Sequence, residues 1–214
     1  MKKLSEFDQP KLTTELTQLS TDEIENEEHY EDVLFQDGIV TGEELRHVYF
    51  RRVHFKNVTF EGVNFHQVEF VDVVFEGCNI SNTEMIGAII HRTAFKRTKL
   101  VGTNFSDSTC IGVSFDDCQA NCSAFHDASL KRVLFQETLL VAAEMIHVKW
   151  EKLALENCRL DGLQLDNTRL KGLDLSRNQF EHIVFTPELL RGLIISPMQS
   201  MALVAQLGVT IKED

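Results

Sequence analysis

Apolar residues recur at every fifth position over most of the chain. In residues 48–75, phenylalanine occupies positions 50, 55, 60, 65, 70 and 75, and valine stands two places before each one. A helix repeats about every 3.6 residues and a strand about every 2, so a period of five is typical of neither. All 33 multiples of five from Phe35 to Ile195 are apolar, and they include 14 of the chain's 15 phenylalanines. We call these positions the centres of the repeat.

Turn-forming residues follow the same period. Nine of the eleven glycines stand two places after a centre, and Asn or Asp occupies that place in many of the other repeats. These residue types tolerate tight turns and positive φ angles. The pattern therefore predicts that the backbone turns a corner once in every five residues.

The largest side chains show a longer period of twenty residues. Phenylalanine recurs at positions 35, 55, 75, 95, 115 and 135. Twenty residues are four repeats, so four corners would close one square turn and stack these rings in a column. Successive turns would pair like parallel strands about 4.8 Å apart. Each turn would bury its apolar edge only against its neighbours, as in a solenoid.

The repeat resembles the pentapeptide repeat family: it reads (A/V/T/C)-x-(F/L)-x-x, as in VHFKN, VTFEG, TNFSD and ANCSAF. The resemblance covers about residues 33–195. It implies an all-β solenoid, a right-handed quadrilateral β-helix of about eight coils, with short helical elements at the termini. Such a rod would be roughly 40 Å long.

Residues 1–32 are predicted to form an acidic N-terminal cap or tail. They hold three Lys and ten Asp or Glu, and Ser20 and Glu23 have the spacing of a capping box. A stacked solenoid needs a cap because its end is otherwise open to edge-to-edge aggregation. A disordered acidic tail is the alternative interpretation of the same composition.

Residues 196–214 predict a helix followed by a short tail. Ser196, Pro197 and Gln199 match the N-cap, N1 and N3 positions, and Gly208 suits the helix end. A helix that is apolar almost all round requires burial. We expect a second subunit to bury it through Met198, Met201, Ala202, Val204, Ala205 and Leu207. Folding back as an end cap is the alternative. The segment QSMALVAQLGVTI resembles the tails that dimerise the quinolone-resistance (Qnr) branch of the family end to end.

The charges sort onto different sides when every fourth repeat is grouped together. The side centred on 50, 70 and onward to 190 is basic, with Arg51, Arg52, Arg92, Lys131, Arg132, Lys149, Lys152, Arg169, Lys171 and Arg191. The preceding side, centred on 45 to 185, is acidic, with Glu44, Glu84, Asp107, Asp127, Glu144 and Asp166. The side centred on 35 is acidic as well and includes Asp116 and Asp117.

These acidic stripes have two interpretations. They are solvated surfaces that keep a rod in solution, or they imitate DNA and bind a partner that normally binds DNA. About 24 phosphate charges lie along 40 Å of B-DNA. Residues 33–195 carry 17 basic and 21 acidic groups, a net charge of −4. Mimicry would therefore have to depend on local stripes and on shape.

The Qnr resemblance favours mimicry. It implies a homodimer that binds DNA gyrase and/or topoisomerase IV and protects it from fluoroquinolones. The frame runs unbroken from 35 to 195, which leaves no room for the loop insertions of Gram-negative Qnr proteins. The chain therefore resembles the loop-less type of Gram-positive species. A structural interaction module with an unrelated partner is the alternative, because a fold alone does not determine function.

Other chemistry is not indicated. The net charge of −12 argues against nucleic acid or an anionic membrane as a direct partner. No HExxH, GxSxG, Walker or GxGxxG motif is present, and a rod filled with phenylalanine leaves no cavity for a substrate. We therefore predict no enzyme, no catalytic residue and no cofactor.

Metal binding and membrane insertion are not expected either. The five cysteines lack zinc-site spacing, and four of them fall at inward positions. His126 and His147 fall on successive coils beside carboxylates, but exposed histidines of this kind are usually only solvated, so no metal is predicted. No apolar run approaches the roughly 18 residues that cross a bilayer, and the N-terminus lacks a signal-peptide core. The expected location is the cytoplasm.

Overall fold

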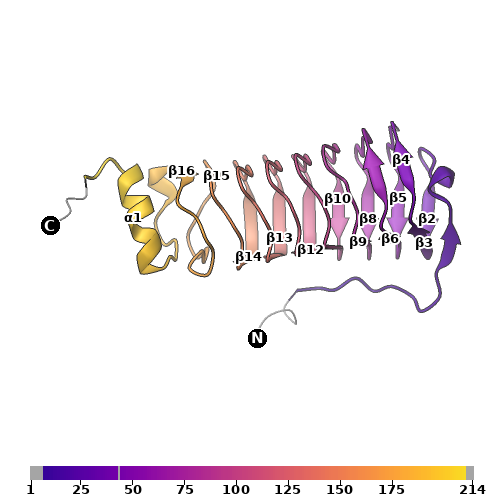
Figure 1. The fold of residues 1–214 in the computed structure, drawn as a ribbon, viewed down its shortest axis with the longest axis horizontal. Coiled ribbons are helices and arrows are strands. Elements are labelled where there is room, and N and C mark those ends of the chain that lie inside the picture. Colours follow the sequence, from indigo (N-terminus) through magenta and orange to yellow (C-terminus); the bar gives the residue numbers. More distant parts are fainter. Residues whose placement is uncertain (1–6, 43, 211–214) are drawn as a thin grey trace.

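The chain winds into a rod of short parallel strands, with a helix across one end (Figure 1). The computed structural model describes residues 7–42 and 44–210. The strands are β1 (Thr17–Leu19), β2 (His29–Glu31), β3 (Val33–Gln36), β4 (Ile39–Thr41), β5 (Tyr49–Arg51), β6 (His54–Lys56), β7 (Thr59–Glu61), β8 (Glu69–Val71), β9 (Val74–Glu76), β10 (Ile89–His91), β11 (Ala94–Lys96), β12 (Thr109–Asp116), β13 (Ser129–Gln136), β14 (Lys149–Glu156), β15 (Leu163–Leu165) and β16 (Ile183–Phe185). The helical elements are the 3-10 turns η2 (Thr21–Glu23) and η3 (Pro187–Leu189) and the helix α1 (Pro197–Gln206).

Strands pair in parallel with the strand one coil later, and partners are twenty residues apart over most of the rod. Phe55 lies opposite Phe75, and Phe95 lies opposite Phe115. Between the strands, single parallel β-bridges join residues that are also twenty positions apart. The chain makes about eight turns, so the predicted right-handed quadrilateral β-helix is confirmed.

The corners of the square turns adopt the left-handed conformation. Every fifth residue from Glu27 to Gly172 has a positive φ angle, and most of these residues are not glycine. None is β-branched, the class for which this conformation is most unfavourable. The predicted corner once per five residues is therefore confirmed, and it holds for side chains as different as Arg52 and Ala142.

Stacked aromatic rings fill the rod. The column Phe35, Phe55, Phe75, Phe95, Phe115 and Phe135 has centroid separations of 4.5–5.3 Å and interplanar angles of 4–14°. These rings are fully buried. The parallel register places each ring over the ring one coil earlier, as the twenty-residue period predicts, and offset stacking of this kind stabilises aromatic pairs beyond their burial.

The inward column that leads to Asn178 carries hydrogen-bonding side chains, which explains how an asparagine is buried there. The side chain of Cys158 and those of the buried Cys and Thr residues at the same position of the preceding coils each donate to the backbone carbonyl oxygen 23 residues earlier. Asn178 continues this column: its Nδ2 donates to the Leu155 carbonyl at 2.9 Å, and its Oδ1 accepts from the Cys158 amide at 2.9 Å. Burial raises the pKa of the Cys158 thiol to about 11. These cysteines pack as small, protonated side chains, as their inward positions predicted.

The coil begins upstream of the predicted boundary at residue 33. Strand β1 pairs with β3, and β2 pairs with β5. Tyr30 stacks on Phe50 at 5.3 Å, and its hydroxyl donates to the Glu23 carbonyl and accepts from the Glu25 amide. The boundary shifts because Tyr30 is itself a centre of the five-residue frame. The predicted capping box of Ser20 and Glu23 is present, on the single 3-10 turn η2.

The regular frame is interrupted after residue 186 and resumes at residues 190–195, where Gly192 has a positive φ angle and Ile194 bridges Asp174. Residues 187–189 form η3, which begins with a proline, and Glu188 is exposed there. After it, α1 begins at the predicted position, and the Ser196 amide donates to Gln199 Oε1 at 2.8 Å. Gly208 has the positive φ angle expected just beyond a helix.

Candidate interaction surfaces

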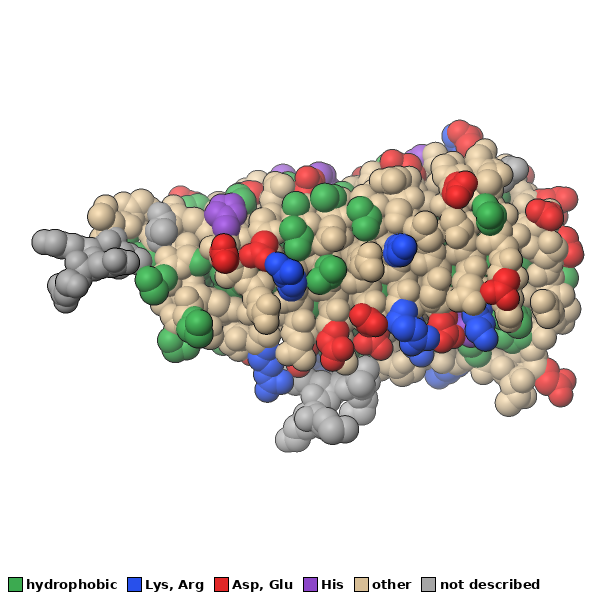
Figure 2. All heavy atoms as spheres, in the orientation of Figure 1, with side chains coloured by type: hydrophobic (Ala, Val, Ile, Leu, Met, Phe, Trp, Pro, Cys, Tyr) green, Lys and Arg blue, Asp and Glu red, His purple; other side chains and the backbone are tan. Residues whose placement is uncertain are grey.

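Four sides run along the rod, one for each repeat within a coil. We call the side centred on residues 50 to 190 the basic side, the one before it in the coil the acidic side, and the one after it the second acidic side. The two acidic sides flank the basic side and face away from each other. In Figure 2 the acidic side forms the upper edge of the rod, where acidic and histidine side chains alternate.

The acidic side brings the predicted carboxylates into columns. A chain of bridges, each twenty residues apart, places Glu44, Glu84 and Glu144 in one column. Asp107 and Asp127 occupy corners of successive coils, so their backbones lie about 4.8 Å apart. The structure therefore gathers residues that are far apart in the sequence onto one side.

Two of these carboxylates are paired with a nearby basic side chain. Glu44 forms an ion pair with Arg46 at 3.1 Å, and Glu144 bonds to the ring of His126. Both pairs are substantially exposed. Exposed pairs contribute only about 0–1 kcal/mol, and they reduce the negative field that these two residues present outward.

The other carboxylates of the acidic side have no arginine or lysine partner. Glu84, Asp107 and Asp166 make no ion pair within the described part of the chain, although Glu84 accepts a hydrogen bond from Asn104 at 2.9 Å, and Asp127 pairs with His147 at 4.0 Å. Asp107 and Asp127 are exposed, on adjacent coils. Like charges at this spacing create a local negative potential in the middle of the rod.

The second acidic side is more mixed. Asp116 and Asp117 make no ion pair with any described residue, but Glu76 contacts both Arg97 and His54. Burial lowers the pKa of His54, even though the neighbouring Glu76 opposes this shift. The carboxylates that sequence reasoning grouped as binding residues thus lie on two opposite sides of the rod and do not form one continuous surface.

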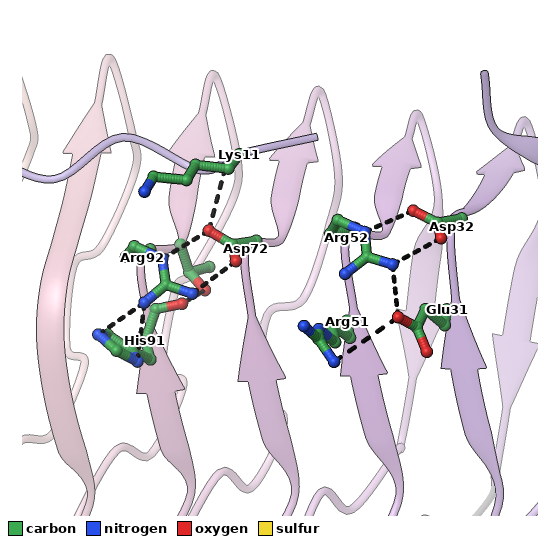
Figure 3. Close-up of polar contacts among 9 residues, drawn as sticks. Lys11, Glu31, Asp32, Arg51, Arg52, Asp72, His91 and Arg92 are labelled. Atoms are coloured by element: carbon green, nitrogen blue, oxygen red, sulfur yellow. Dashed lines mark hydrogen bonds and ion pairs between the residues drawn. The ribbon is translucent and has the colours of Figure 1, made fainter. Parts of the chain in front are cut away.

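The basic side is largely neutralised in its N-terminal half (Figure 3). Arg52 makes two hydrogen bonds to Asp32, at 2.6 and 2.7 Å, and Arg92 makes two to Asp72, at 2.7 and 2.6 Å. Each pair joins corners of successive coils. Hydrogen bonding to Arg52 lowers the pKa of Asp32. These arginines stabilise the coil and are not free to contact a partner.

Only 7% of the Asp72 side chain is exposed to solvent. Burial by itself would raise the pKa of Asp72, but the hydrogen bonds from Arg92 and from the Lys11 amide outweigh burial and lower it. Asp72 is therefore held as a carboxylate and fixes both the coil and the N-terminal segment.

Residues 7–16, which we call the N-terminal arm, run back along the outside of the rod from its first coil (Figure 1). The Lys11 amide donates to Asp72 at 3.0 Å, and the Thr13 hydroxyl donates to Asp32 at 2.9 Å. Farther along, Asp8 forms an ion pair with Arg132 at 2.9 Å. The sequence pattern did not predict this contact, because residues 7–16 lie outside the five-residue frame.

The C-terminal part of the basic side is different. Lys149, Lys152, Arg169 and Lys171 make no ion pair with any described residue. With Asp127, His147 and Glu151 they line a shallow hollow of about 900 Å³ whose wall includes Trp150. The indole of Trp150 is partly buried against the core and donates to the Arg169 carbonyl at 2.7 Å. Strand β14 is the last strand of its sheet, so the regular ladder ends at this hollow.

Helix α1 contacts the end of the rod with one face and leaves the other exposed. Gln199 donates to the carbonyls of Leu175 and Asn178 at 2.9 and 2.8 Å, and Leu203 is 5% exposed. On the outer face, Met198 is 89% exposed and Met201 60% exposed. The helix thus caps its own rod, as the alternative interpretation held, and still presents an apolar face.

The other predicted contact residues differ in exposure. Leu207 is 44% exposed, and Ala202 and Val204 are half-buried. The side chain of Ala205 lies outside those that the structure describes. Most of the named dimerisation residues are therefore accessible in this chain.

The histidines and cysteines do not form a metal-binding cluster. Within residues 7–42 and 44–210, no group of three or more His, Cys, Asp or Glu side chains is arranged to hold a metal ion. Cys122 is exposed at a corner, and the other four cysteines are buried. None of the helices in these residues is long and apolar enough to cross a membrane.

A family model described as "Pentapeptide repeat region" matches residues 48–109, 68–145 and 88–165 of the chain. A search of curated proteins found none that matches this chain.

Solved structures with a similar coil include full-length QnrB1, described as a plasmid-mediated fluoroquinolone resistance protein. It is 14% identical, with coverage of 90% of this chain and 95% of that one and a TM-score of 0.40. HetL from the cyanobacterium Nostoc sp. strain PCC 7120, involved in heterocyst differentiation regulation, is 16% identical, with coverage of 80% and 86% and a TM-score of 0.38. A pentapeptide repeat protein from the Arabidopsis thaliana thylakoid lumen is 16% identical, with coverage of 48% and 68% and a TM-score of 0.37. Matches at this level carry no argument about function.

Proposed function

The chain belongs to the pentapeptide repeat family, and from this premise we propose that it is a protein-binding rod of the Qnr type. In this proposal it binds DNA gyrase, topoisomerase IV or both in the cytoplasm, in place of DNA, and protects the enzyme from fluoroquinolones. The contact is made by carboxylates and not by catalytic groups or a cofactor.

Three carboxylates in the middle of the acidic side are the observation that carries the proposal. Glu84, Asp107 and Asp127 lie on the same side and make no ion pair with an arginine or lysine among the described residues; Asp127 has only His147, at 4.0 Å. Coils are about 4.8 Å apart, and phosphates on one DNA strand recur about every 3.4 Å along the axis. A groove lined with Lys and Arg for DNA would meet a comparable row of negative groups.

The position of the other charges supports the choice of this side. The basic side is adjacent to it, but its N-terminal arginines are paired with Asp32 and Asp72 and present little free positive charge. Asp116 and Asp117 lie on the far side of the rod, so they would contact only a partner that encloses it. We therefore assign the main contact to the acidic side.

The proposed assembly is a dimer through α1. Met198 and Met201 are exposed on the outer face of the helix, beside Leu207. Burying a side chain of this size contributes roughly 1.5–3 kcal/mol, so a symmetric contact would bury several such groups twice. Two rods joined at these ends would extend roughly 80 Å or more.

A gyrase supercoiling assay with ciprofloxacin tests the function. We expect the protein to restore supercoiling in the presence of the drug and to retain gyrase in a pull-down. No rescue at any protein concentration, together with no pull-down of gyrase or topoisomerase IV, would favour an interaction module with an unrelated partner.

The dimer is tested separately by light scattering. Met201→Asp places a charge in the proposed contact, and we expect it to halve the mass of the particle. Met201→Leu is the matched control and should leave the mass at that of a dimer. A monomeric wild-type protein, or an unchanged mass for Met201→Asp, would refute the interface.

A further inference from the structure

The corner column of the basic side shows an alternation that stops at one place. At intervals of twenty residues it reads Asp32, Arg52, Asp72, Arg92, Gly112, Arg132 and Lys152. Each of the first two acids bonds to the arginine one coil later. At the third acidic position the chain has Gly112, so the preceding coil supplies no corner carboxylate to Arg132.

The N-terminal arm supplies the missing carboxylate. Asp8 Oδ2 accepts from Arg132 at 2.9 and 3.2 Å. A Cβ atom placed on Gly112 would lie 2.9 Å from Asp8 Cβ and 3.0 Å from its Oδ2. The absent side chain at residue 112 is therefore what allows the arm to approach. This corner binds a carboxylate carried by an extended segment that comes from outside the coil.

The arm is attached by few contacts. Besides Asp8, they include one hydrogen bond from the Lys11 amide and one from the Thr13 hydroxyl, and Phe7 is buried. Asp8 keeps 43% of its side chain exposed, and an exposed ion pair is a weak attachment. An acidic segment of another protein could therefore compete with the arm for Arg132.

The surface continues past Arg132 with cations that the arm does not neutralise. Lys152, Arg169 and Lys171 line the hollow next to Trp150, together with two carboxylates, Asp127 at its edge and Glu151, which forms an ion pair with Lys131. The Trp150 indole is held by its hydrogen bond to the Arg169 carbonyl, so it offers a fixed apolar wall beside the positive charges. An extended segment could place its carboxylates against these cations and one apolar side chain against Trp150.

We propose that the basic side from Gly112 to Lys171 is a docking surface for an extended acidic segment of a partner protein, and that the N-terminal arm occupies its first position in cis through Asp8. The surface is one side of a narrow rod, flanked on both edges by acidic sides. These edges repel a DNA duplex, which presents phosphates across its whole width, but leave room for a single polypeptide strand. The docking surface lies mainly on a different side from the topoisomerase contact proposed above, but the two meet at Asp127, which lines the edge of the hollow.

A short fluorescein-labelled poly-glutamate peptide serves as the probe, with the full-length protein and its variants. Anisotropy measures binding, and Trp150, the chain's one tryptophan, reports occupation of the hollow through its fluorescence. Phe7→Ser combined with Asp8→Ala should release the arm and tighten peptide binding about tenfold. A gain of this size means that the arm covers its position about nine-tenths of the time, because the apparent affinity scales with the uncovered fraction.

Two further variants locate the surface. Lys152→Ala combined with Arg169→Ala should weaken peptide binding about tenfold and abolish the fluorescence change. Lys99→Ala, an exposed lysine on the side opposite the basic side, is the matched control and should change neither. Binding should also weaken as salt is added.

Several outcomes would overturn the proposal. Equal affinity of the wild type and the arm variant would refute the competition by Asp8. No peptide binding by the arm variant, or unchanged binding after loss of Lys152 and Arg169, would refute the surface. A DNA duplex of the same length that binds as tightly as the peptide would show that the occupant is nucleic acid and not an acidic polypeptide.

Discussion

The acidic side and the N-terminal half of the basic side both carry rows of charges, but they use them differently. On the basic side, opposite charges stand one coil apart, so Arg52 bonds to Asp32 and Arg92 to Asp72. On the acidic side, Asp107 and Asp127 stand one coil apart with the same sign. The first arrangement links coils together, and the second directs charge outward.

This difference shows how a solenoid separates stability from recognition. A residue in the coil has its nearest neighbours twenty residues before and after it. Opposite signs at that interval stabilise the rod, whereas equal signs cost some stability and create a surface potential. The number of charges on a side therefore says less about binding than their order along its columns.

The largest expected effect is the loss of a paired carboxylate on the basic side. Asp72→Ala leaves the partly buried Arg92 without its partner, and loss of these charged hydrogen bonds should lower the free energy of unfolding by about 1.5–3 kcal/mol. Asp107→Ala removes an unpaired, exposed carboxylate and should change it by less than about 0.5 kcal/mol. Urea denaturation of both variants measures the contrast. Equal losses would show that the two sides do not differ in this way.

A smaller effect is expected from two glycines at corners with nearly the same φ angle. Gly62→Ala introduces a side chain where nothing lies within 4 Å, so only the left-handed backbone is unfavourable, at about 1 kcal/mol. Gly112→Ala has the same backbone cost, and its methyl group also pushes against Asp8. This second effect should destabilise the protein by a further amount of at most about 1 kcal/mol.

Denaturation in an Asp8→Ala background is the control for this pair. There the extra cost at Gly112 should shrink towards that at Gly62. If it does not change, the arm is not held at Gly112 as described.

The smallest effect is a pH dependence with two windows, set by two groups on the basic side. Burial alone would raise the pKa of Asp72, but its hydrogen bonds, chiefly those from Arg92, lower it below 3.8. The contribution of Asp72 to stability is therefore complete above pH 3.8 and is lost as the pH falls through its folded pKa. Burial lowers the pKa of His91 from 6.5, so the unfolded chain takes up this proton first and stability already declines as the pH drops below 6.5.

Thermal melts between neutral and acid pH test these two groups. We expect the melting temperature to fall in both windows, and His91→Gln to flatten the upper one. An unchanged profile for that variant would assign the upper window to other groups, such as His54, whose pKa burial also lowers.

The sequence predicted the fold in detail because the same five positions recur. The column of Phe35 to Phe135 and the corners such as Asn57 follow directly from the periods of five and twenty. The start of the coil was placed too late, although Tyr30 already stands on a centre and Asp32 on a corner. The acidic composition of residues 1–32 instead predicted a cap or tail, although both residues keep the five-residue spacing.

The candidate surfaces were less predictable. Ordering the corners at intervals of twenty would have paired Asp32 with Arg52, since the opposite signs are visible in the sequence. The contact of Asp8 with Gly112 and Arg132 could not be found in this way, because the arm lies outside the repeat and its path is set by tertiary contacts. Likewise, the hollow at Trp150 depends on where the strand ladder ends.

A gyrase-binding titration with charge-reversed variants tests the central claim most directly. The triple variant Glu84→Lys, Asp107→Lys and Asp127→Lys should lose binding and drug protection, and the wild-type affinity should fall as salt is raised. The matched variant Arg169→Glu and Lys171→Glu changes the basic side and should bind gyrase as the wild type does. Equal loss of binding in the two variants, or full binding by the triple variant, would contradict a DNA-like contact through the acidic side.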